Sequence, residues 1–251
     1  MSTDLEWERW GQRDPYFGVI TDPKYRREGL TEEARSEFFA SGEAHVRYVS
    51  EMIRQYLGAD FRARTVLDFG CGVGRLLIPF AREAEEAYGL DVSPSMIEEA
   101  RRNCESQGVA NARLLVSTDS GLAALGRTFD LVHSYIVFQH IPPPRGLALF
   151  AALVDLVAPG GVGALHCTYA KACHAETHGR PPPPAPPPPA PGALSPVEAP
   201  RDPAADPEMQ MNAYDVNPLL FALQRRGVLR FHAEFTDHGG ELGLFLFFRK
   251  P

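Results

Sequence analysis

The stretch Val66-Leu67-Asp68-Phe69-Gly70-Cys71-Gly72-Val73-Gly74-Arg75 contains the strongest structural signal in this sequence. The apolar run over 65–69 predicts a short buried strand, and the residues over 75–82 predict the helix that follows it. Three alternating glycines lie between them, where the chain must turn sharply and where a ligand can approach the backbone closely. The stretch therefore predicts a ligand-binding loop at the carboxyl end of a strand.

Predicted strands and helices alternate after this loop, which is typical of a parallel sheet covered by helices on both faces. The predicted strands cover 87–91, 112–117, 128–134 and 162–168, and the predicted helices cover 94–107 and 144–157. A helix is expected over 214–226. The strands expected over 228–235 and 242–249 are joined by a connection short enough for an antiparallel hairpin.

The 251 residues are expected to form one large domain with two additions. Residues 1–60 have mainly helical spacing and predict an N-terminal helical extension, in which 14–18 could fold over the ligand as a lid. Residues 61–251 hold the alternating pattern. Within them, the window 175–208 contains 13 of the 23 prolines, and we expect it to be a flexible insertion.

Charge and composition exclude several partners. The net charge of −7 makes nucleic acid an unexpected partner, because proteins that bind duplexes usually carry a basic surplus. No apolar run approaches the roughly 18 residues that span a membrane, and residues 1–10 lack the apolar stretch of a signal peptide. The four cysteines are scattered, which is typical of reduced thiols. A cytoplasmic protein with no membrane partner is expected.

The acid that ends the second predicted strand suggests what the glycine loop binds. Asp91 lies 17 residues after Gly74, where an acid in such sheets can accept both hydroxyls of a ribose. A dinucleotide site would need glycine at the sixth position of G-x-G-x-x-G, but Arg75 stands there. Asp68 beside the loop would repel a pyrophosphate and attract a cation. S-adenosylmethionine, which combines a ribose, a sulfonium and an ammonium, fits better.

With these residues in place, the chain resembles a class I S-adenosylmethionine-dependent methyltransferase. Further blocks match the family's order: 89–96, 117–120, 129–134 and 156–161. The resemblance covers 62–170 and 209–250. It implies a Rossmann-like, doubly wound α/β fold, with a seven-stranded, mostly parallel sheet that ends in an antiparallel hairpin.

The resemblance also implies roles for individual residues. The loop glycines would bring backbone against the methionine part of the cofactor, Asp68 would hold its ammonium, and Asp91 would bind the ribose. Met96 is as readily a core residue as an adenine contact, and Cys71 is better suited to packing than to nucleophilic attack. The residues expected at the cofactor are Asp68, Gly70, Cys71, Gly72, Gly74, Arg75, Asp91, Val92, Met96, Asp119, Ser120 and Ser134.

The acceptor should meet the methyl group at the carboxyl ends of the fourth and fifth strands. Tyr135 and His140 follow the fourth strand and are the expected catalytic residues. His140 is a candidate general base, because an unperturbed imidazole titrates near neutrality, although it could instead only hold the loop before Pro142. The spacing of Cys167, Cys173, His174 and His178 matches no common zinc pattern, so no metal is expected.

These features predict an S-adenosylmethionine-dependent methyltransferase that acts on an oxygen or nitrogen of a small-molecule acceptor. Two alternatives stay open: a cofactor-binding module that recruits a partner through its polyproline segment, and a methyltransferase of protein or RNA. The sequence does not reveal the acceptor, the oligomeric state or the role of the proline-rich insertion.

Overall fold

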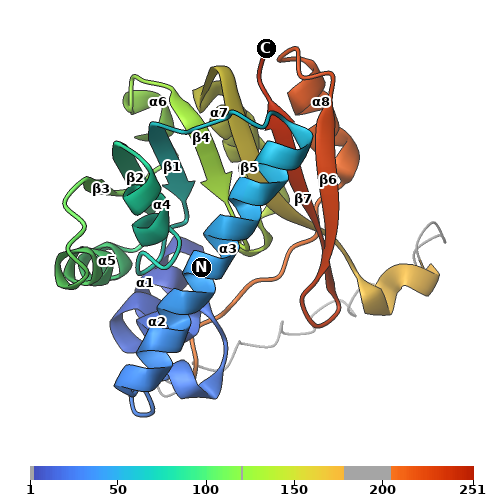
Figure 1. Cartoon of the computed structure of the whole chain (residues 1–251). Helices are drawn as coiled ribbons and strands as arrows, with labels where there is room; N and C mark the ends of the chain where they lie inside the picture. The colour runs from blue at the N-terminus through green and yellow to red at the C-terminus, as the bar shows by residue number, and fades with distance from the viewer. Residues whose placement is uncertain (1–2, 120, 178–204) are drawn as a thin grey trace, which may run out of the picture.

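A seven-stranded sheet forms the centre of the molecule in a computed structural model, which describes residues 3–119, 121–177 and 205–251 (Figure 1). The strand order is β3-β2-β1-β4-β5-β7-β6. The pairs from β3 to β5 are parallel, whereas β7 runs antiparallel to both β5 and β6. The doubly wound fold with its final hairpin is therefore confirmed. Ser120 and most of the 175–208 insertion lie outside the described residues.

The elements follow the order expected from the sequence. The strands are β1 (Thr65–Phe69), β2 (Glu86–Asp91), β3 (Ala112–Val116), β4 (Phe129–Ser134), β5 (Val157–Lys171), β6 (Phe231–Asp237) and β7 (Glu241–Arg249). The α-helices are α1 (Thr3–Arg13), α2 (Pro15–Val19), α3 (Glu32–Tyr56), α4 (Leu77–Glu83), α5 (Pro94–Ser106), α6 (Gly121–Ala124), α7 (Pro143–Leu156) and α8 (Val216–Gln224). Short 3-10 helices occupy Pro23–Tyr25, Phe138–His140 and Ala172–Thr177.

The largest departure from the predicted elements is β5, which is longer at both ends than the expected 162–168. Its start pairs Val157 with Phe129, and after a register shift Val162 pairs with Leu131. Its far end stays paired with β7 as far as Lys171, opposite Glu241. The residues Pro159-Gly160-Gly161, which precede the strand expected over 162–168, lie within the span of β5 because the irregular register accommodates them.

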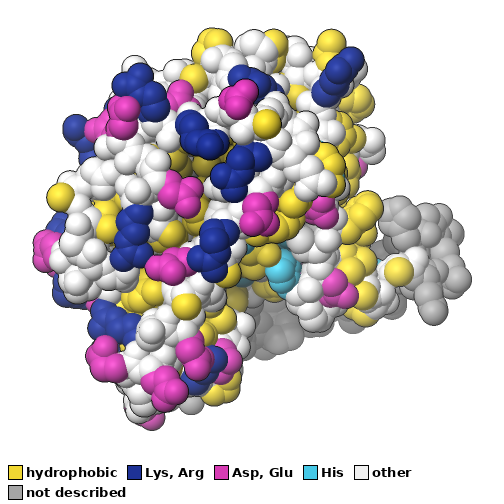
Figure 2. Space-filling view, in the orientation of Figure 1, with side chains coloured by type: hydrophobic (Ala, Val, Ile, Leu, Met, Phe, Trp, Pro, Cys, Tyr) yellow, Lys and Arg dark blue, Asp and Glu magenta, His cyan; other side chains and the backbone are white. Residues whose placement is uncertain are grey.

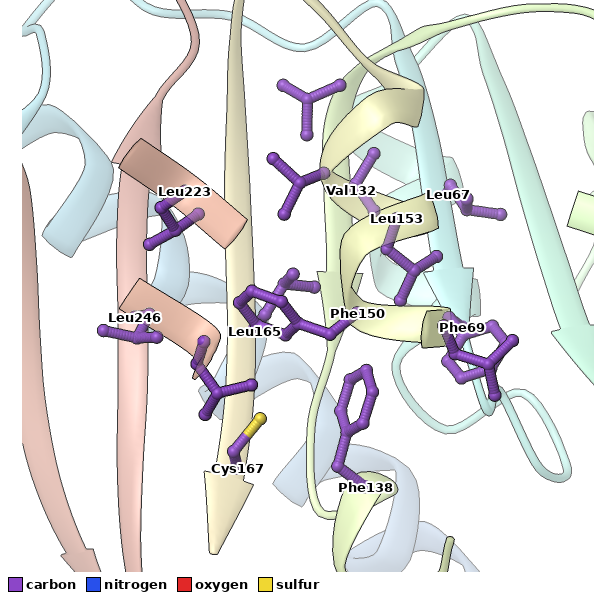
Figure 3. Packing of buried hydrophobic residues seen from close by; sticks show 14 of the residues in the cluster. Leu67, Phe69, Val132, Phe138, Phe150, Leu153, Leu165, Cys167, Leu223 and Leu246 are labelled. Carbon is purple, nitrogen blue, oxygen red and sulfur yellow. The ribbon is translucent and has the colours of Figure 1, made fainter. Parts of the chain in front are cut away.

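Both faces of the sheet are buried by helices. On one face, Phe150 and Leu153 of α7 pack toward Val132 and Leu165, with Leu223 of α8 in the same cluster (Figure 3). The other face holds a second cluster, to which α3, α4 and α5 contribute, and Figure 1 shows α3 crossing this side of the sheet. The apolar strands of the sequence pattern are thus explained by burial on two sides.

The N-terminal helices pack onto the glycine loop through a third cluster of buried side chains. Trp10, Tyr16 and Tyr25 meet Phe38 of α3 and also Met96, which lies in the first turn of α5. The side chain of Glu8 accepts hydrogen bonds from the hydroxyls of Ser93 and Ser95 at 2.7 Å. Through these contacts α1 lies next to the carboxyl edge of the sheet, where the site forms.

Surface charge is mixed on the face that carries α3, where basic and acidic side chains alternate without a large region of one sign (Figure 2). Among the helices of the described ranges, none is both long and apolar enough to cross a membrane. All four cysteines are free thiols, three of them buried.

Candidate active site

A cavity of about 590 Å³ lies at the carboxyl edge of the sheet, between the glycine loop and the N-terminal segment. Thr3, Asp4 and Trp7 of α1 border it, together with residues 18–21 and with Met209 and Met211. Eleven of the fourteen predicted site residues also border it: Asp68, Gly70, Cys71, Gly72, Arg75, Asp91, Val92, Met96, Asp119, Tyr135 and His140. Residues separated widely in the sequence therefore share one cavity.

The glycine loop adopts the left-handed conformations that favour glycine. Gly70 has φ 75° and Gly72 has φ 52°, and the Gly70 amide donates to the Leu90 carbonyl at 2.7 Å. A Cβ on Gly70 would lie 2.3 Å from a methyl of Val137, and one on Gly72 would lie 2.7 Å from a methyl of Val19. Both positions require glycine, because neighbouring chain segments pack directly against the loop.

Two of the predicted cofactor residues do not border the cavity. Gly74 has φ 88° and packs against Ala100, while its amide donates to the Cys71 carbonyl at 2.9 Å. The buried hydroxyl of Ser134 donates to the Phe69 carbonyl at 3.0 Å. These two residues shape the loop and hold β1 to β4. Cys71 borders the cavity, but burial raises the pKa of its thiol well above the usual value, as expected for a packing residue.

Asp68 and Arg75 place opposite charges at one part of the cavity wall. Asp68 is buried, its Oδ1 bonds Nδ1 of His133 at 2.8 Å, and its Oδ2 has no hydrogen-bond partner among the described residues. The Nε of Arg75 is also buried and, within the same described ranges, unpartnered. Burial lowers the pKa of this guanidinium, and the negative charge of Asp68 partly offsets that effect. A ligand with an ammonium and a carboxylate would complement both groups.

Asp91 joins the glycine loop to the start of α5. Its Oδ2 accepts a hydrogen bond from the Gly72 amide and its Oδ1 one from the Ser93 amide, both at 2.9 Å. Burial raises the pKa of Asp91 to about 6, although these amide donors oppose the shift. Each carboxylate oxygen has a further lone pair, so the side chain can still accept from two ligand hydroxyls.

Two ion pairs in the wall of the cavity include Asp119, one of the residues expected at the cofactor. The Arg145 guanidinium, from α7, pairs with Asp4 of α1 at 2.6 Å and with Asp119 after β3 at 2.7 Å. These two carboxylates hold the pKa of Arg145 above its ordinary value. Met96 is 1% exposed and contacts the N-terminal cluster, so it serves core packing while also bordering the cavity with Val92.

The His140 side chain is held by one hydrogen bond to a segment distant in sequence and one to its neighbour Gln139. Its Nδ1 lies 2.8 Å from the Gln210 carbonyl, so this nitrogen donates its proton, and its Nε2 lies 3.3 Å from the Gln139 amide nitrogen. Trp7 contacts the ring edge-on, with centroids 4.8 Å apart. Burial lowers the pKa of His140 to about 4. The side chain is thus neutral at pH 7, and it fixes residue 210 against the cavity.

Tyr135 is surrounded by three histidines that the sequence analysis did not single out. Its hydroxyl lies 3.4 Å from Nε2 of His238, which follows β6 and also borders the cavity. His166 of β5 and His45 of α3 contact the Tyr135 ring, with centroids 5.0 and 4.1 Å away. No local motif marks these histidines, since each sits in an ordinary strand, helix or turn. In the described ranges, no three His, Cys, Asp or Glu side chains are arranged to hold a metal ion.

Comparison with known proteins places this geometry in a family. Residues 66–161 match the family described as a methyltransferase domain. This match runs from β1 to the start of β5, and over these residues the chain is similar to methyltransferases. Among curated methyltransferases, it is 37% identical over 102 residues to the ubiquinone biosynthesis O-methyltransferase of Cereibacter sphaeroides strain KD131, a match that covers 41% of this chain and 40% of that protein. It is 36% identical over 94 residues to the aklanonic acid methyltransferase DauC of Streptomyces sp. strain C5. This match covers 36% of this chain and 43% of that protein. The chain thus matches less than half the length of either relative.

Solved methyltransferase structures share the whole fold at low identity. The magnesium protoporphyrin IX methyltransferase of Synechocystis PCC 6803, with bound SAM, superposes with a TM-score of 0.61 at 17% identity, over 100% of this chain and 98% of that one. The N-methyltransferase NodS of Bradyrhizobium japonicum WM9, in complex with S-adenosyl-L-homocysteine, gives a TM-score of 0.57 at 14% identity, with both chains fully covered. At these identities the likeness concerns the methyltransferase fold.

Proposed function

We propose that this chain binds S-adenosylmethionine and transfers its methyl group to an oxygen or nitrogen atom of a small-molecule acceptor. The observation that carries the proposal is the buried Oδ2 of Asp68, which has no partner in the described ranges and lies in the wall of the cavity beside Arg75. A buried carboxylate oxygen without a hydrogen bond destabilises the fold unless a ligand donates one to it. A ligand ammonium is the group that it suits.

The residues of the cavity fit each part of the cofactor. Asp68 would accept from the ammonium of the methionine end, and Arg75 would donate to the carboxylate. Asp91 would accept from the ribose hydroxyls, and Val92 and Met96 border the cavity where the adenine is expected. When bound, the sulfonium of the cofactor supplies an electrophilic methyl group whose leaving group departs neutral.

The work left to the chain is mainly positioning and the exclusion of water. Because methyl transfer is an in-line displacement, the rate depends on holding the acceptor atom and the methyl group in line. Trp7 and residues 18–21 enclose the cavity from the N-terminal side, and Met209 and Met211 from the C-terminal side. We propose that residues 14–18 and their neighbours act as a cover over the bound cofactor.

A small-molecule acceptor suits a cavity of about 590 Å³ with mostly apolar walls better than a protein or an RNA does. The similar proteins described above include an O-methyltransferase of ubiquinone biosynthesis and the N-methyltransferase NodS, so both atoms remain in the proposal. The four free cysteines fit a reducing compartment such as the cytoplasm. No nucleic-acid partner is proposed, because the net charge is −7.

Two measurements test this proposal. Calorimetric titration with S-adenosylmethionine and with NAD should show binding of the first alone, and a chain that prefers NAD would overturn it. Incubation with S-adenosylmethionine and a metabolite extract should then produce a compound heavier by one methylene group. Binding without any methylated product would instead support the cofactor-binding module.

A further inference from the structure

One polar pair in the wall of the cavity includes a histidine to which the proposed function assigns no role. Tyr135, directly after β4, and His238, in the turn between β6 and β7, both border the cavity together with Arg75. The Tyr135 hydroxyl and Nε2 of His238 lie 3.4 Å apart. An atom in contact with both would lie at the carboxyl edge of the sheet, on the methionine side of the proposed cofactor site.

The turn that carries His238 is held in place from two sides. The Asp237 carboxylate accepts from the Gly240 amide at 2.7 Å, and the Gly240 carbonyl accepts from the Ala172 amide at 2.8 Å, which ties the turn to the end of β5. The His238 amide donates to the Glu241 carbonyl at 3.1 Å. His238 is therefore presented by an anchored turn, as a side chain that acts on a ligand must be.

Tyr135 is also firmly positioned. Its ring packs against His45, His166 and Phe245, with centroid distances of 4.1, 5.0 and 5.2 Å. The next residue, Ile136, has φ 57°, a left-handed conformation that is unusual for a β-branched side chain. Strained backbone of this kind concentrates at functional sites, where the surrounding structure holds it.

The ring of His166 contacts both Tyr135 and His238. This buried side chain bonds the Thr236 hydroxyl through Nε2 at 2.8 Å, and its ring lies 5.5 Å from that of His238. A Cβ on Gly243 would come within 2.2 Å of both the His166 nitrogen and the Thr236 oxygen. The glycine in β7 thus makes room for this hydrogen bond behind the turn.

We propose that Tyr135 and His238 hold the hydroxyl of a phenolic acceptor and that Nε2 of His238 takes its proton. As the acceptor oxygen forms its bond to the methyl carbon, the carbon–sulfur bond of the sulfonium breaks and its electron pair stays on sulfur. The phenolic proton moves to His238, which therefore carries its resting proton on Nδ1. This inference rests on the proposed function and names the acceptor class and the base.

A phenol is the acceptor that suits this pair best. Its hydroxyl has a pKa of roughly 10, so a neutral imidazole can remove the proton as the methyl bond forms, which is far harder for an aliphatic alcohol. The walls of the same cavity include Ile20, Ile136, Met209 and Met211, which are apolar and adaptable surfaces for a planar ring.

His238 is better suited to be the base than His140. Burial lowers the pKa of both imidazoles, but His238 is only partly buried and Asp237 opposes the shift, whereas the pKa of His140 falls to about 4. The titratable groups facing His238 are Tyr135 from the end of β4, His166 from β5 and Asp237 on its own hairpin.

The test uses the full chain with S-adenosylmethionine and pyrocatechol, a simple phenol. The variant H238N should lower kcat by about 100-fold or more, the usual contribution of a general base, while the Kd for S-adenosylmethionine stays within about twofold of wild type. Y135F should raise KM for pyrocatechol about tenfold, as expected for one lost hydrogen bond. The matched control is H232N, because His232 lies on the same hairpin, stacks on Tyr56 and does not border the cavity.

The pH dependence separates the two histidines. In wild type, kcat should fall about tenfold per pH unit on an acidic limb whose midpoint lies below the ordinary imidazole pKa, because burial lowers the pKa of His238, and this limb should disappear in H238N. A limb centred near pH 4 would assign the base to His140 and overturn the inference. So would wild-type kcat in H238N, or a wild-type chain that binds S-adenosylmethionine without methylating pyrocatechol. Absence of S-adenosylmethionine binding would contradict the proposed function instead.

Discussion

His133 binds one carboxylate oxygen of Asp68, and the other oxygen is buried without a hydrogen-bond partner in the described part of the chain. The Nδ1 to Oδ1 distance is 2.8 Å, and both side chains are almost fully buried. The second ring nitrogen of His133 lies 3.1 Å from Nε2 of His45 on α3. The imidazole therefore fixes the plane of the carboxylate, so that Oδ2 is directed before any ligand arrives.

The variant D68N should weaken binding of S-adenosylmethionine by about 10- to 100-fold, because a hydrogen bond to a charged group contributes about 1.5–3 kcal/mol. Calorimetric titration measures the change. Methylthioadenosine is the control ligand, since it keeps the adenosine and lacks the ammonium and carboxylate. Its affinity should not change, and an equal loss for both ligands would show that Asp68 only supports the fold.

Cofactor affinity should depend on pH through Asp91. Burial raises the pKa of this carboxyl to about 6, with a smaller contribution from the charge of Asp68. Ribose hydroxyls bind its ionised form, so affinity is full above pH 6 and falls by up to tenfold per unit below it. Titration with methylthioadenosine at pH 5 and pH 7 should show a difference of about tenfold. The same difference in D91N would contradict this assignment.

The Arg145 bridge should slow the release of the cofactor. Because this guanidinium ties Asp4 of α1 to Asp119, R145Q should increase the dissociation rate of S-adenosylmethionine by about 3- to 10-fold, as expected for two partly exposed ion pairs. The effect should shrink in 1 M salt, which screens such pairs. R226Q is a matched control, since Arg226 makes a similar pair with Asp155 at 2.7 Å and does not border the cavity.

Substitution of Gly42 by alanine should destabilise the fold, although alanine is usually favoured over glycine inside a helix. Replacing glycine by alanine inside a helix commonly stabilises it by about 1 kcal/mol. In α3, however, a Cβ on Gly42 would lie 2.1 Å from the Arg75 carbonyl oxygen, so α3 would be displaced from the glycine loop. We expect G42A to lower the free energy of unfolding in urea by about 1–3 kcal/mol.

The control for G42A is S36A, at an exposed position of the same helix. It gains helix propensity without a new contact and should raise stability by up to about 0.5 kcal/mol. A gain in stability for G42A comparable to that of S36A would show that α3 does not touch the loop as described.

Much of the fold could be predicted because its signals are local. Ser93 accepts from the Met96 amide as the N-cap of α5, with Pro94 in the first turn, as their order along the chain indicates. The end of α5 differs from the prediction by one residue. The start of β5 was not foreseen, because its pairing with Phe129 depends on a register irregularity between two strands rather than on its own residues.

The candidate site was predictable only where its residues lie near the glycine loop or the following strand ends. Asp68, Gly70, Gly72 and Asp91 follow a spacing that a nucleoside-binding sheet imposes, and all border the cavity. Gly74 obeys the same spacing but packs against Ala100 of α5, in the turn that leads into α4.

The sequence by itself determined the order of the strands and helices and the chemistry of the loop, since both depend on residues close together in the chain. The tertiary structure alone decided which polar groups meet. His133 reaches Asp68 across 65 residues, and His238 reaches Tyr135 across 103. Such pairs form because neighbouring strands are not consecutive: β4 lies beside β1, and the β6–β7 hairpin closes the sheet next to β5. Burial at that edge then changes the pKa values of the groups it brings together.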